Sequence, residues 1–349
     1  MKNLIKLLSI VFLFGAFFAS CEGPEGPAGA DASAECMECH NDGTEFSAKQ
    51  SEFNASAHSL GTYFNRDGEC AGCHSTEGFL ARADFTSITE IYDLPAGQSA
   101  ISCRTCHTVH TAYDETDWTL TFIAQVTETI FGSKNTTDLN ESISFADYGN
   151  GNMCLQCHQA RDRGGVPTVT STDAVATSSH WGPHYGVQGN VLVASGGVNI
   201  PGDEDYPTAT EGHATLSEAC ISCHMVDGDH TLGVNFDACA TCHGSADDAE
   251  DLVDDLHDEI DALKFELGRA LAEAGAMKPT TESAWVWDDD LGVHVEEIDT
   301  TGYVPSGTVT AAQARAVYNY MVVYQDHSYG VHNPSYVRAL LNNSLDALK

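Results

Sequence analysis

Basic residues are scarce in this chain of 349 residues, which has 15 Lys and Arg against 51 Asp and Glu. The formal net charge is −36 at pH 7. A charge of this sign and size argues against nucleic acid and against an anionic membrane surface as partners. It leaves basic proteins, divalent cations and mineral surfaces as candidates, or a solvated acidic face that serves solubility alone.

Long apolar runs are also lacking, except at the start of the chain. Residues 1–20 contain two lysines, a short apolar run and small residues before Cys21. This run is too short for a membrane span and is typical of an export signal. "FASC" resembles the lipobox of bacterial lipoproteins, which predicts that Cys21 is acylated, whereas the alternative is an unmodified thiol. Residues 21–35, with "GPEGPAGADA", are predicted to form a stiff spacer.

Cys21 is the one cysteine of this sequence that stands outside a repeated motif. Every other Cys belongs to one of six copies of Cys-x-x-Cys-His. This motif is typical of c-type haem attachment, in which two thiols bond to the haem vinyl groups and the adjacent His binds the iron. Zinc sites combine two Cys pairs and do not require a His after each pair. A disulfide scaffold would leave the six histidines unexplained.

The six motifs predict covalent attachment of six haems. The predicted thioether residues are Cys36, Cys39, Cys70, Cys73, Cys103, Cys106, Cys154, Cys157, Cys220, Cys223, Cys239 and Cys242. The predicted proximal iron ligands are His40, His74, His107, His158, His224 and His243.

The chain has 16 histidines, so enough remain to fill the second axial position of every iron. From their sequence contexts we predict the distal ligands His58, His110, His184, His213, His230 and His332. His180, His257 and His327 stay open as alternatives to His184. His257 lies beside an apolar helical stripe and is expected at the edge of a core, and His294 is expected at the surface.

His110 follows His107 by three residues in "SCRTCHTVHTAY". The thioether bonds hold this backbone on the His107 side of the ring, so His110 cannot reach the other side of the same macrocycle. As a ligand, His110 therefore serves a different haem, and the two haems must lie close together. The alternative is a hydrogen bond from His110 to a haem propionate.

Several stretches resemble the multihaem cytochrome c superfamily, close to the groups related to pentahaem nitrite reductases and octahaem cytochromes. They are "NMCLQCHQ", "HWGPHYGVQGNVLVASGG", "CISCHM", "GDHTLG", "CATCHG" and "DHSYGVHNPSYVRALL". The resemblance covers about residues 36–349 and implies that His332, in "GVHNP", is a distal ligand. The His at the position of His213 or His230 resembles further distal ligands. The nitrite reductases also attach one open haem through Cys-x-x-Cys-Lys, and this sequence has no such motif.

The expected fold is mainly α with much irregular loop, organised around a packed haem array. Residues 36–245 are predicted to bind the haems, with little helical periodicity. Residues 246–349 are predicted to form a helical region that packs on the array. It comprises a helix within 248–276, a hairpin within 286–298, and helices near 310–326 and 334–347. The first helix carries an apolar stripe of Leu252, Leu256, Ile260, Leu263, Leu267 and Leu271. Asn333 and Pro334 mark the start of the last helix.

These observations predict a lipid-anchored hexahaem cytochrome at the outer membrane or cell surface, in anaerobic or extracellular respiration. Saturated bis-histidine irons favour an electron carrier over an enzyme, with redox proteins or an extracellular acceptor as partners. Two alternatives remain open. One is a reductase of a small nitrogen or sulfur oxyanion at one open haem, and the other is a self-associating subunit of a conducting filament.

Overall fold

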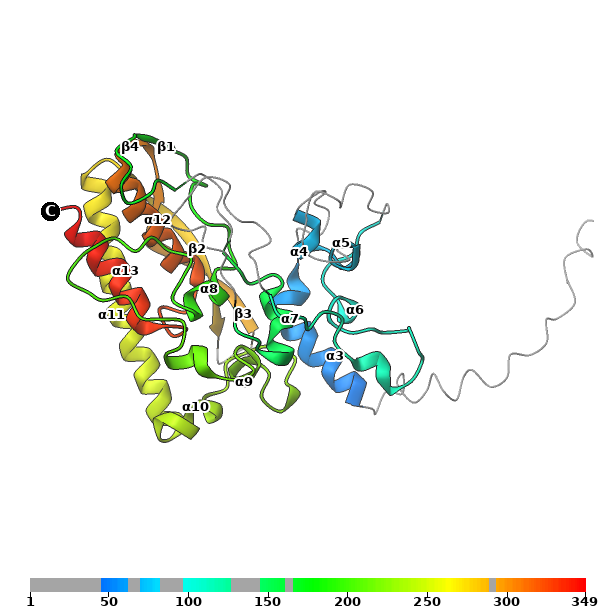
Figure 1. Ribbon diagram of the computed structural model, residues 1–349. Helices are drawn as coiled ribbons and strands as arrows, with labels where there is room; N and C mark the ends of the chain where they lie inside the picture. Colours follow the sequence, from blue (N-terminus) through cyan, green and yellow to red (C-terminus); the bar gives the residue numbers. More distant parts are fainter. Residues whose placement is uncertain (1–44, 62–69, 82–96, 127–144, 161–165, 289–292) are drawn as a thin grey trace, which may run out of the picture. The chain divides into compact units, whose positions relative to one another are not determined.

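Helices of one to eight turns alternate with irregular loops in this protein (Figure 1). The structure, a computed structural model, describes residues 45–61, 70–81, 97–126, 145–160, 166–288 and 293–349. Within these ranges the strands form only two-stranded sheets. The fold is therefore mainly α with much irregular loop, as predicted. Residues 49–349 form one compact unit, which carries the sites described below.

Five Cys-x-x-Cys-His motifs lie on short helices within the described residues. One helical turn places cysteines three residues apart on the same side of the helix. The His that follows ends the turn, because its N–H donates to the carbonyl of the first Cys, at 2.8 Å for His107 and 2.9 Å for His158 and His224. The helices are α4 (Ala71–His74), α6 (Cys103–Cys106), α7 (Asn152–Leu155), α9 (Ile221–His224) and α10 (Phe236–His243).

Other short elements connect these motifs. The helices are α3 (Glu45–Ala55), α5 (Thr76–Ala81) and α8 (Gln188–Leu192). Single 3₁₀ turns cover Ala57–Leu60, Glu115–Trp118, Gly149–Gly151, Gly212–Thr215 and Val226–Gly228. Strand β1 (Val175–Thr177) pairs antiparallel with β4 (Gly307–Val309) and so joins the motif-bearing region to the C-terminal part of the chain.

The longest helix is α11 (Ala246–Glu273), which confirms the predicted helix there. It begins at Ser245, whose hydroxyl accepts from the Asp248 N–H while the Asp248 carboxylate accepts from the Ser245 N–H, a capping box. Four residues of the predicted apolar stripe are buried, whereas Leu252 is 53% exposed. The buried four are Leu256, Ile260, Leu267 and Leu271. No helix of the described ranges is both long and apolar enough to cross a bilayer.

Helices α12 (Ala311–Asp326) and α13 (Pro334–Asp346) confirm the two predicted C-terminal helices. Asn333 caps α13 by accepting from the Tyr336 N–H at 3.1 Å, and Pro334 occupies the first turn, as predicted. Helices α11, α12 and α13 pack against one another, and Figure 1 shows them in yellow, orange and red.

The predicted hairpin is present but longer than its sequence pattern indicates. Strand β2 (Met277–Asp288) pairs antiparallel with β3 (Val293–Pro305), with a register shift between Thr280 and Glu282. The hairpin contacts α11 through both of its strands. At its base Tyr303 packs over Gly268 of α11, where a Cβ atom would lie 2.4 Å from the tyrosine ring. Gly268 therefore allows a close approach of helix and hairpin.

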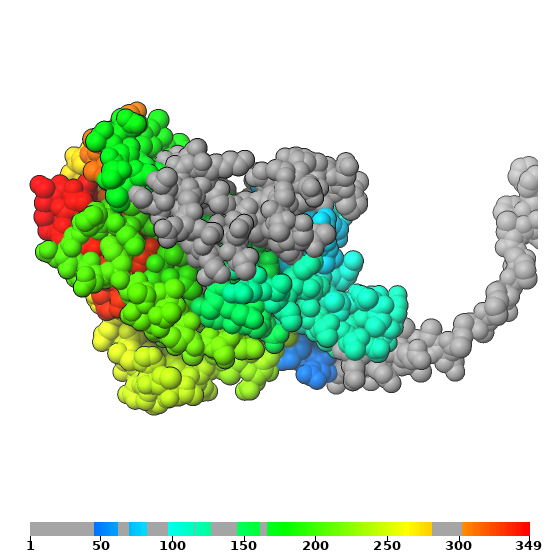
Figure 2. Space-filling view, in the orientation of Figure 1, coloured from blue at the N-terminus to red at the C-terminus, as the bar shows by residue number. Residues whose placement is uncertain are grey.

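The main hydrophobic core combines side chains from both sides of position 245. Val191 and Val198 pack in the same cluster as Val317 and Leu340. Asn319 of α12 joins the two sides by accepting from the Val198 N–H at 2.7 Å and donating to the Val198 carbonyl at 2.9 Å. On the face in Figure 2, green residues of the motif-bearing region lie beside α13 in red. A second, smaller cluster surrounds Phe145 and Leu155.

Candidate haem sites

Five predicted attachment motifs lie within the described residues, and their cysteines form no disulfide there. The first motif, Cys36, Cys39 and His40, lies outside these residues, as does Cys21. The attachment roles of all these residues stay predictions, and the described motifs provide thiols on one side of a helical turn with a histidine next to them.

Each of the five described proximal histidines faces one predicted distal histidine. The two imidazole rings of every pair belong to separate segments of the chain, and the space between them is large enough for one metal ion. The ring-centroid distances are 5.9 Å for His58–His158, 6.0 Å for His74–His184, 6.1 Å for His107–His230, 6.1 Å for His213–His243 and 6.4 Å for His224–His332.

These ring separations fit a six-coordinate metal between each pair. A metal–imidazole nitrogen bond is about 2 Å long and the ring centre lies about 1 Å beyond the nitrogen, so two ligands on opposite sides place their centroids about 6 Å apart. Among the described residues no group of three or more His, Cys, Asp or Glu is arranged to hold a metal ion. Two axial imidazoles suit an iron whose other four ligands come from a porphyrin.

Hydrogen bonds at Nδ1 orient most of the paired imidazole rings. An oxygen acceptor at Nδ1 places the proton there and leaves the Nε2 lone pair free to bind a metal. The acceptors are Trp118 O for His107 (2.7 Å), Gln188 Oε1 for His158 (3.0 Å), Tyr185 O for His184 (2.8 Å), Val331 O for His213 (2.9 Å), Leu232 O for His224 (3.0 Å), Gly228 O for His230 (2.7 Å) and Asp326 Oδ1 for His332 (2.8 Å).

Burial keeps several of these imidazoles neutral. It lowers the pKa of His107 and of His224, in each case with a further contribution from the facing histidine. Burial and the neighbouring His158 lower the pKa of His58 to about 4. The Nδ1 atom of His58 is shielded from solvent and has no hydrogen-bond partner within the described residues. Neutral imidazole is the form that binds a metal ion.

His332 has the opposite electrostatic environment. Burial acts to lower its pKa, but the charge of Asp326 and its hydrogen bond outweigh burial and raise the pKa above the usual value. The Asp326 side chain is fully buried. No sequence motif marks Asp326 as a site residue, because its role depends on the turn that follows α12.

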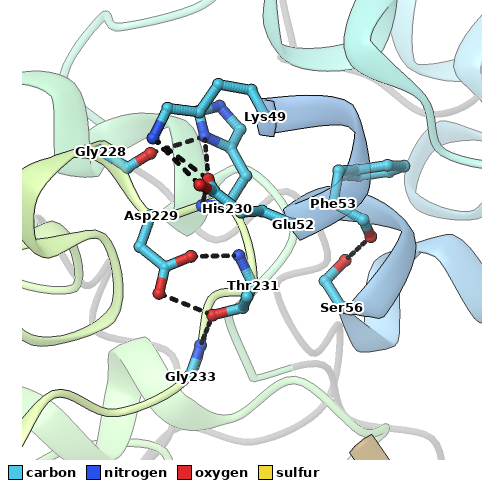
Figure 3. A network of polar contacts seen from close by, with 9 residues as sticks. All are labelled: Lys49, Glu52, Phe53, Ser56, Gly228, Asp229, His230, Thr231 and Gly233. Carbon is cyan, nitrogen blue, oxygen red and sulfur yellow. Dashed lines mark hydrogen bonds and ion pairs between the residues drawn. The ribbon is translucent and has the colours of Figure 1, made fainter. Parts of the chain in front are cut away.

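The loop that carries His230 is held in place by α3 and by its own side chains (Figure 3). The Glu52 carboxylate accepts from the His230 N–H at 3.0 Å and is paired with Lys49 at 3.1 Å. Within the loop, the Asp229 carboxylate accepts from the N–H and hydroxyl of Thr231 at 2.8 and 2.9 Å. These contacts fix the backbone on both sides of the imidazole and so aim the ring at His107.

Thiols of different motifs lie next to one another. The Cys154 thiol donates a hydrogen bond to Cys220, which raises the pKa of Cys154 and lowers that of Cys220 to about 7. Cys106 lies near enough to Cys154 to raise its pKa further. Burial and then Cys239 raise the pKa of Cys223. The third to sixth motifs therefore form a continuous spatial series.

His110 stacks on Tyr113, with ring centroids 5.7 Å apart. Each of the five described proximal histidines faces a ring other than that of His110. Both His110 and Tyr113 have a positive φ of 62°. The Asp117 carboxylate holds this turn by accepting three backbone N–H groups, from Thr111 (3.0 Å), Ala112 (2.6 Å) and Tyr113 (3.0 Å).

The alternatives to His184 lie elsewhere. His180 is exposed, and its Nδ1 lies 3.2 Å from the Ser179 hydroxyl. His257 packs on Tyr329 at 4.7 Å, and His327 stacks on Tyr185 at 6.0 Å. His294 lies in the part of β3 whose side chains are outside the described residues.

No family model and no curated protein matches the chain. A crystal structure of the outer cell wall cytochrome OcwA is similar, with a TM-score of 0.50 and 18% sequence identity. The fold of this chain is therefore similar to that of OcwA. The similarity covers 86% of this chain and 50% of OcwA, so this chain spans about half the length of that protein.

Proposed function

We propose that the protein is a multihaem c-type cytochrome that transfers electrons. One observation carries this proposal: every described Cys-x-x-Cys-His histidine faces a second histidine at 5.9–6.4 Å. Each such pair would hold one haem iron, and the neighbouring thiols would attach the porphyrin. When bound, the iron takes up and releases one electron by changing between the ferric and ferrous states.

We propose that His110 is the distal ligand of a haem other than that of His107, because a residue only three positions further on cannot reach the other side of the same macrocycle. Three backbone N–H groups donate to the Asp117 carboxylate and hold the turn that carries His110.

The contacts between motifs support transfer from one haem to the next. Cys154 lies beside Cys220, so the fourth and fifth attachment points are close together. Loop 228–233 carries His230 to the third motif while its Leu232 carbonyl accepts from His224 of the fifth. Such short spacings between redox centres are what electron transfer through a protein needs. Two axial histidines at each iron favour a carrier over a reductase, which requires an open coordination position.

The proposed location is the outer membrane or cell surface. The export signal and the lipid attachment predicted at Cys21 support it, and the name of OcwA as an outer cell wall cytochrome is in keeping with it. At that position an extracellular acceptor or a redox protein serves as partner, in anaerobic or extracellular respiration. The acidic composition favours a basic docking surface on that partner.

Substitution of one distal histidine tests the proposal. In His184→Ala the iron of His74 loses its sixth ligand, so one of six low-spin haems becomes high-spin, as measured by electron paramagnetic resonance and visible absorption. The matched control is His180→Ala, four residues earlier, where the exposed imidazole lies 3.2 Å from the Ser179 hydroxyl. The control keeps six low-spin haems. Equal spectra for the two variants would exclude His184 as a ligand.

A further inference from the structure

The carboxylate of Asp326, at the end of α12, is fully buried. Its Oδ1 accepts from His332 Nδ1 at 2.8 Å, and its Oδ2 accepts from the Ser328 hydroxyl. The turn that follows has His327 and Tyr329 at positive φ values of 55° and 47°, a conformation that folds Ser328 and His332 back over the carboxylate. The side chain is therefore held against the imidazole by two hydrogen bonds.

Six other predicted axial histidines of the described residues donate from Nδ1 to uncharged acceptors. His107, His184, His213, His224 and His230 donate to backbone carbonyls, and His158 donates to an amide oxygen. Glu52 is also near an axial ligand, but its Oε2 lies 3.9 Å from His230 Nδ1 and is partly exposed beside Lys49. Among the Nδ1 contacts given for the described residues, Asp326 combines a carboxylate, burial and a direct hydrogen bond.

A single glutamine connects Asp326 to the neighbouring site. Gln188 Oε1 accepts from His158 Nδ1 at 3.0 Å, and Gln188 Nε2 donates to the Asp326 carbonyl at 3.2 Å. His158 and His332 thus belong to adjacent sites, with a neutral amide at one and a carboxylate at the other. On the far side of the fourth site, His58 Nδ1 has no hydrogen-bond partner in the described part of the chain.

We propose that Asp326 is a positioning residue that lowers the reduction potential of the haem between His224 and His332 relative to the haem between His58 and His158. This inference rests on the proposed function. A carboxylate acceptor makes the imidazole a stronger electron donor, and its buried negative charge stabilises ferric over ferrous iron. His58 lacks such an acceptor at Nδ1 among the described residues, so it is a weaker electron donor and raises the reduction potential of the fourth site. At equilibrium an electron shared by these two haems resides mainly on the fourth site.

Spectroelectrochemical titration of the complete haem-loaded protein tests the inference. In Asp326→Asn the ferrous-to-ferric ratio of one haem, at a fixed applied potential, rises at least tenfold, which is about 59 mV for a one-electron couple. The other five haems keep their potentials. Low-temperature spectra identify the affected haem by its altered low-spin signal and check that all six irons remain low-spin.

The reciprocal variant is Gln188→Glu, which places a carboxylate beside His158 and lowers the potential of the fourth site. If Asp326→Asn does not accumulate as folded protein, Gln188→Glu still tests whether a carboxylate beside an axial histidine lowers the reduction potential. Glu52→Gln is the control for the magnitude of the shift, which is smaller there because that carboxylate is partly exposed and paired with Lys49.

Two failures are distinguishable. Six low-spin signals with unchanged potentials in both Asp326→Asn and Gln188→Glu would overturn the role of Asp326 and leave the electron-transfer proposal standing. A shift in Glu52→Gln as large as that in Asp326→Asn would equally overturn the claim that burial and the direct hydrogen bond matter. A wild-type protein without six low-spin haems contradicts the proposed function itself, before any variant is compared.

Discussion

At the scale of single residues, hydrogen bonds to the chain orient most of the paired histidines. Their Nδ1 hydrogen bonds to the chain select the tautomer whose Nε2 carries no proton. The acceptors come from loops and helix ends, so each ring is held by tertiary structure as well as by its own rotamer. The same hydrogen bonds also set how strongly each imidazole donates electrons, which makes them the natural means of giving chemically identical haems different potentials.

A residue-scale prediction concerns the turn that carries His110. Asp117→Asn preserves the size of the side chain but removes the charge and one of the oxygens that accept from Thr111, Ala112 and Tyr113. Since His110 has a positive φ, the loosened turn relaxes and the ligand moves. One of six low-spin signals weakens in the electron paramagnetic resonance spectrum.

The control for that variant is Asp114→Asn, in the same loop, where the carboxylate accepts from the N–H and hydroxyl of Thr116 and from none of residues 111–113 among the bonds given. It leaves all six signals unchanged. The role given to Asp117 is contradicted if only the control loses a signal, or if both variants keep all six signals.

At the scale of elements, the C-terminal helices supply the apolar core that the motif-bearing loops cannot build alone. Within residues 45–126 the buried apolar side chains of the described segments are few, with Phe79 the largest. In contrast, α11, α12 and α13 bury long runs of side chains against each other and against residues 181–200. The stability of the protein therefore depends strongly on α11.

Leu267→Ala tests that dependence. Leu267 is fully buried in the main cluster, so the variant loses about 2–5 kcal/mol of unfolding free energy. The matched control is Leu252→Ala on the same helix, where the side chain is 53% exposed and the expected change is within about 0.5 kcal/mol. Urea unfolding followed by circular dichroism measures both. Similar losses in the two variants would show that α11 does not bury the face described.

A pH prediction follows from the ion pair between α11 and α13. Arg338 donates to both Glu259 oxygens at 2.6 and 2.7 Å, and these hydrogen bonds lower the pKa of Glu259 below its usual value. Because the folded-state pKa is the lower one, the stabilisation is complete above the unfolded-state pKa and is lost as pH falls through the folded-state value.

The pair is partly exposed, so its contribution is small, about 0.5 kcal/mol. Unfolding free energies of the wild type and Glu259→Gln at pH 7 and pH 3 measure it. The two proteins differ at pH 7 and converge at pH 3. A constant difference at both values would contradict the assignment.

At the scale of the whole molecule, local patterns and tertiary contacts were unequally accessible from the sequence. The motifs were visible because attachment chemistry depends on spacing within five residues, and α11, α12 and α13 because burial repeats at helical periodicity. Sequence context favoured His184 and left His180, His257 and His327 open as alternatives. The pairing was not predictable, because His58 meets His158 and His224 meets His332 only through the folding of distant segments. Asp326 was not predicted for the same reason. The chain has many carboxylates, and only the turn after α12 brings this one to His332.

The measurement that tests the central claim most directly is a count of low-spin and high-spin irons in the oxidised protein. It uses low-temperature electron paramagnetic resonance and visible absorption, with and without nitrite or hydroxylamine. The account predicts six low-spin haems and no change on adding either ligand, because histidines occupy both axial positions of each iron. A high-spin iron whose spectrum shifts with nitrite or hydroxylamine would contradict the electron carrier and identify an open, catalytic haem.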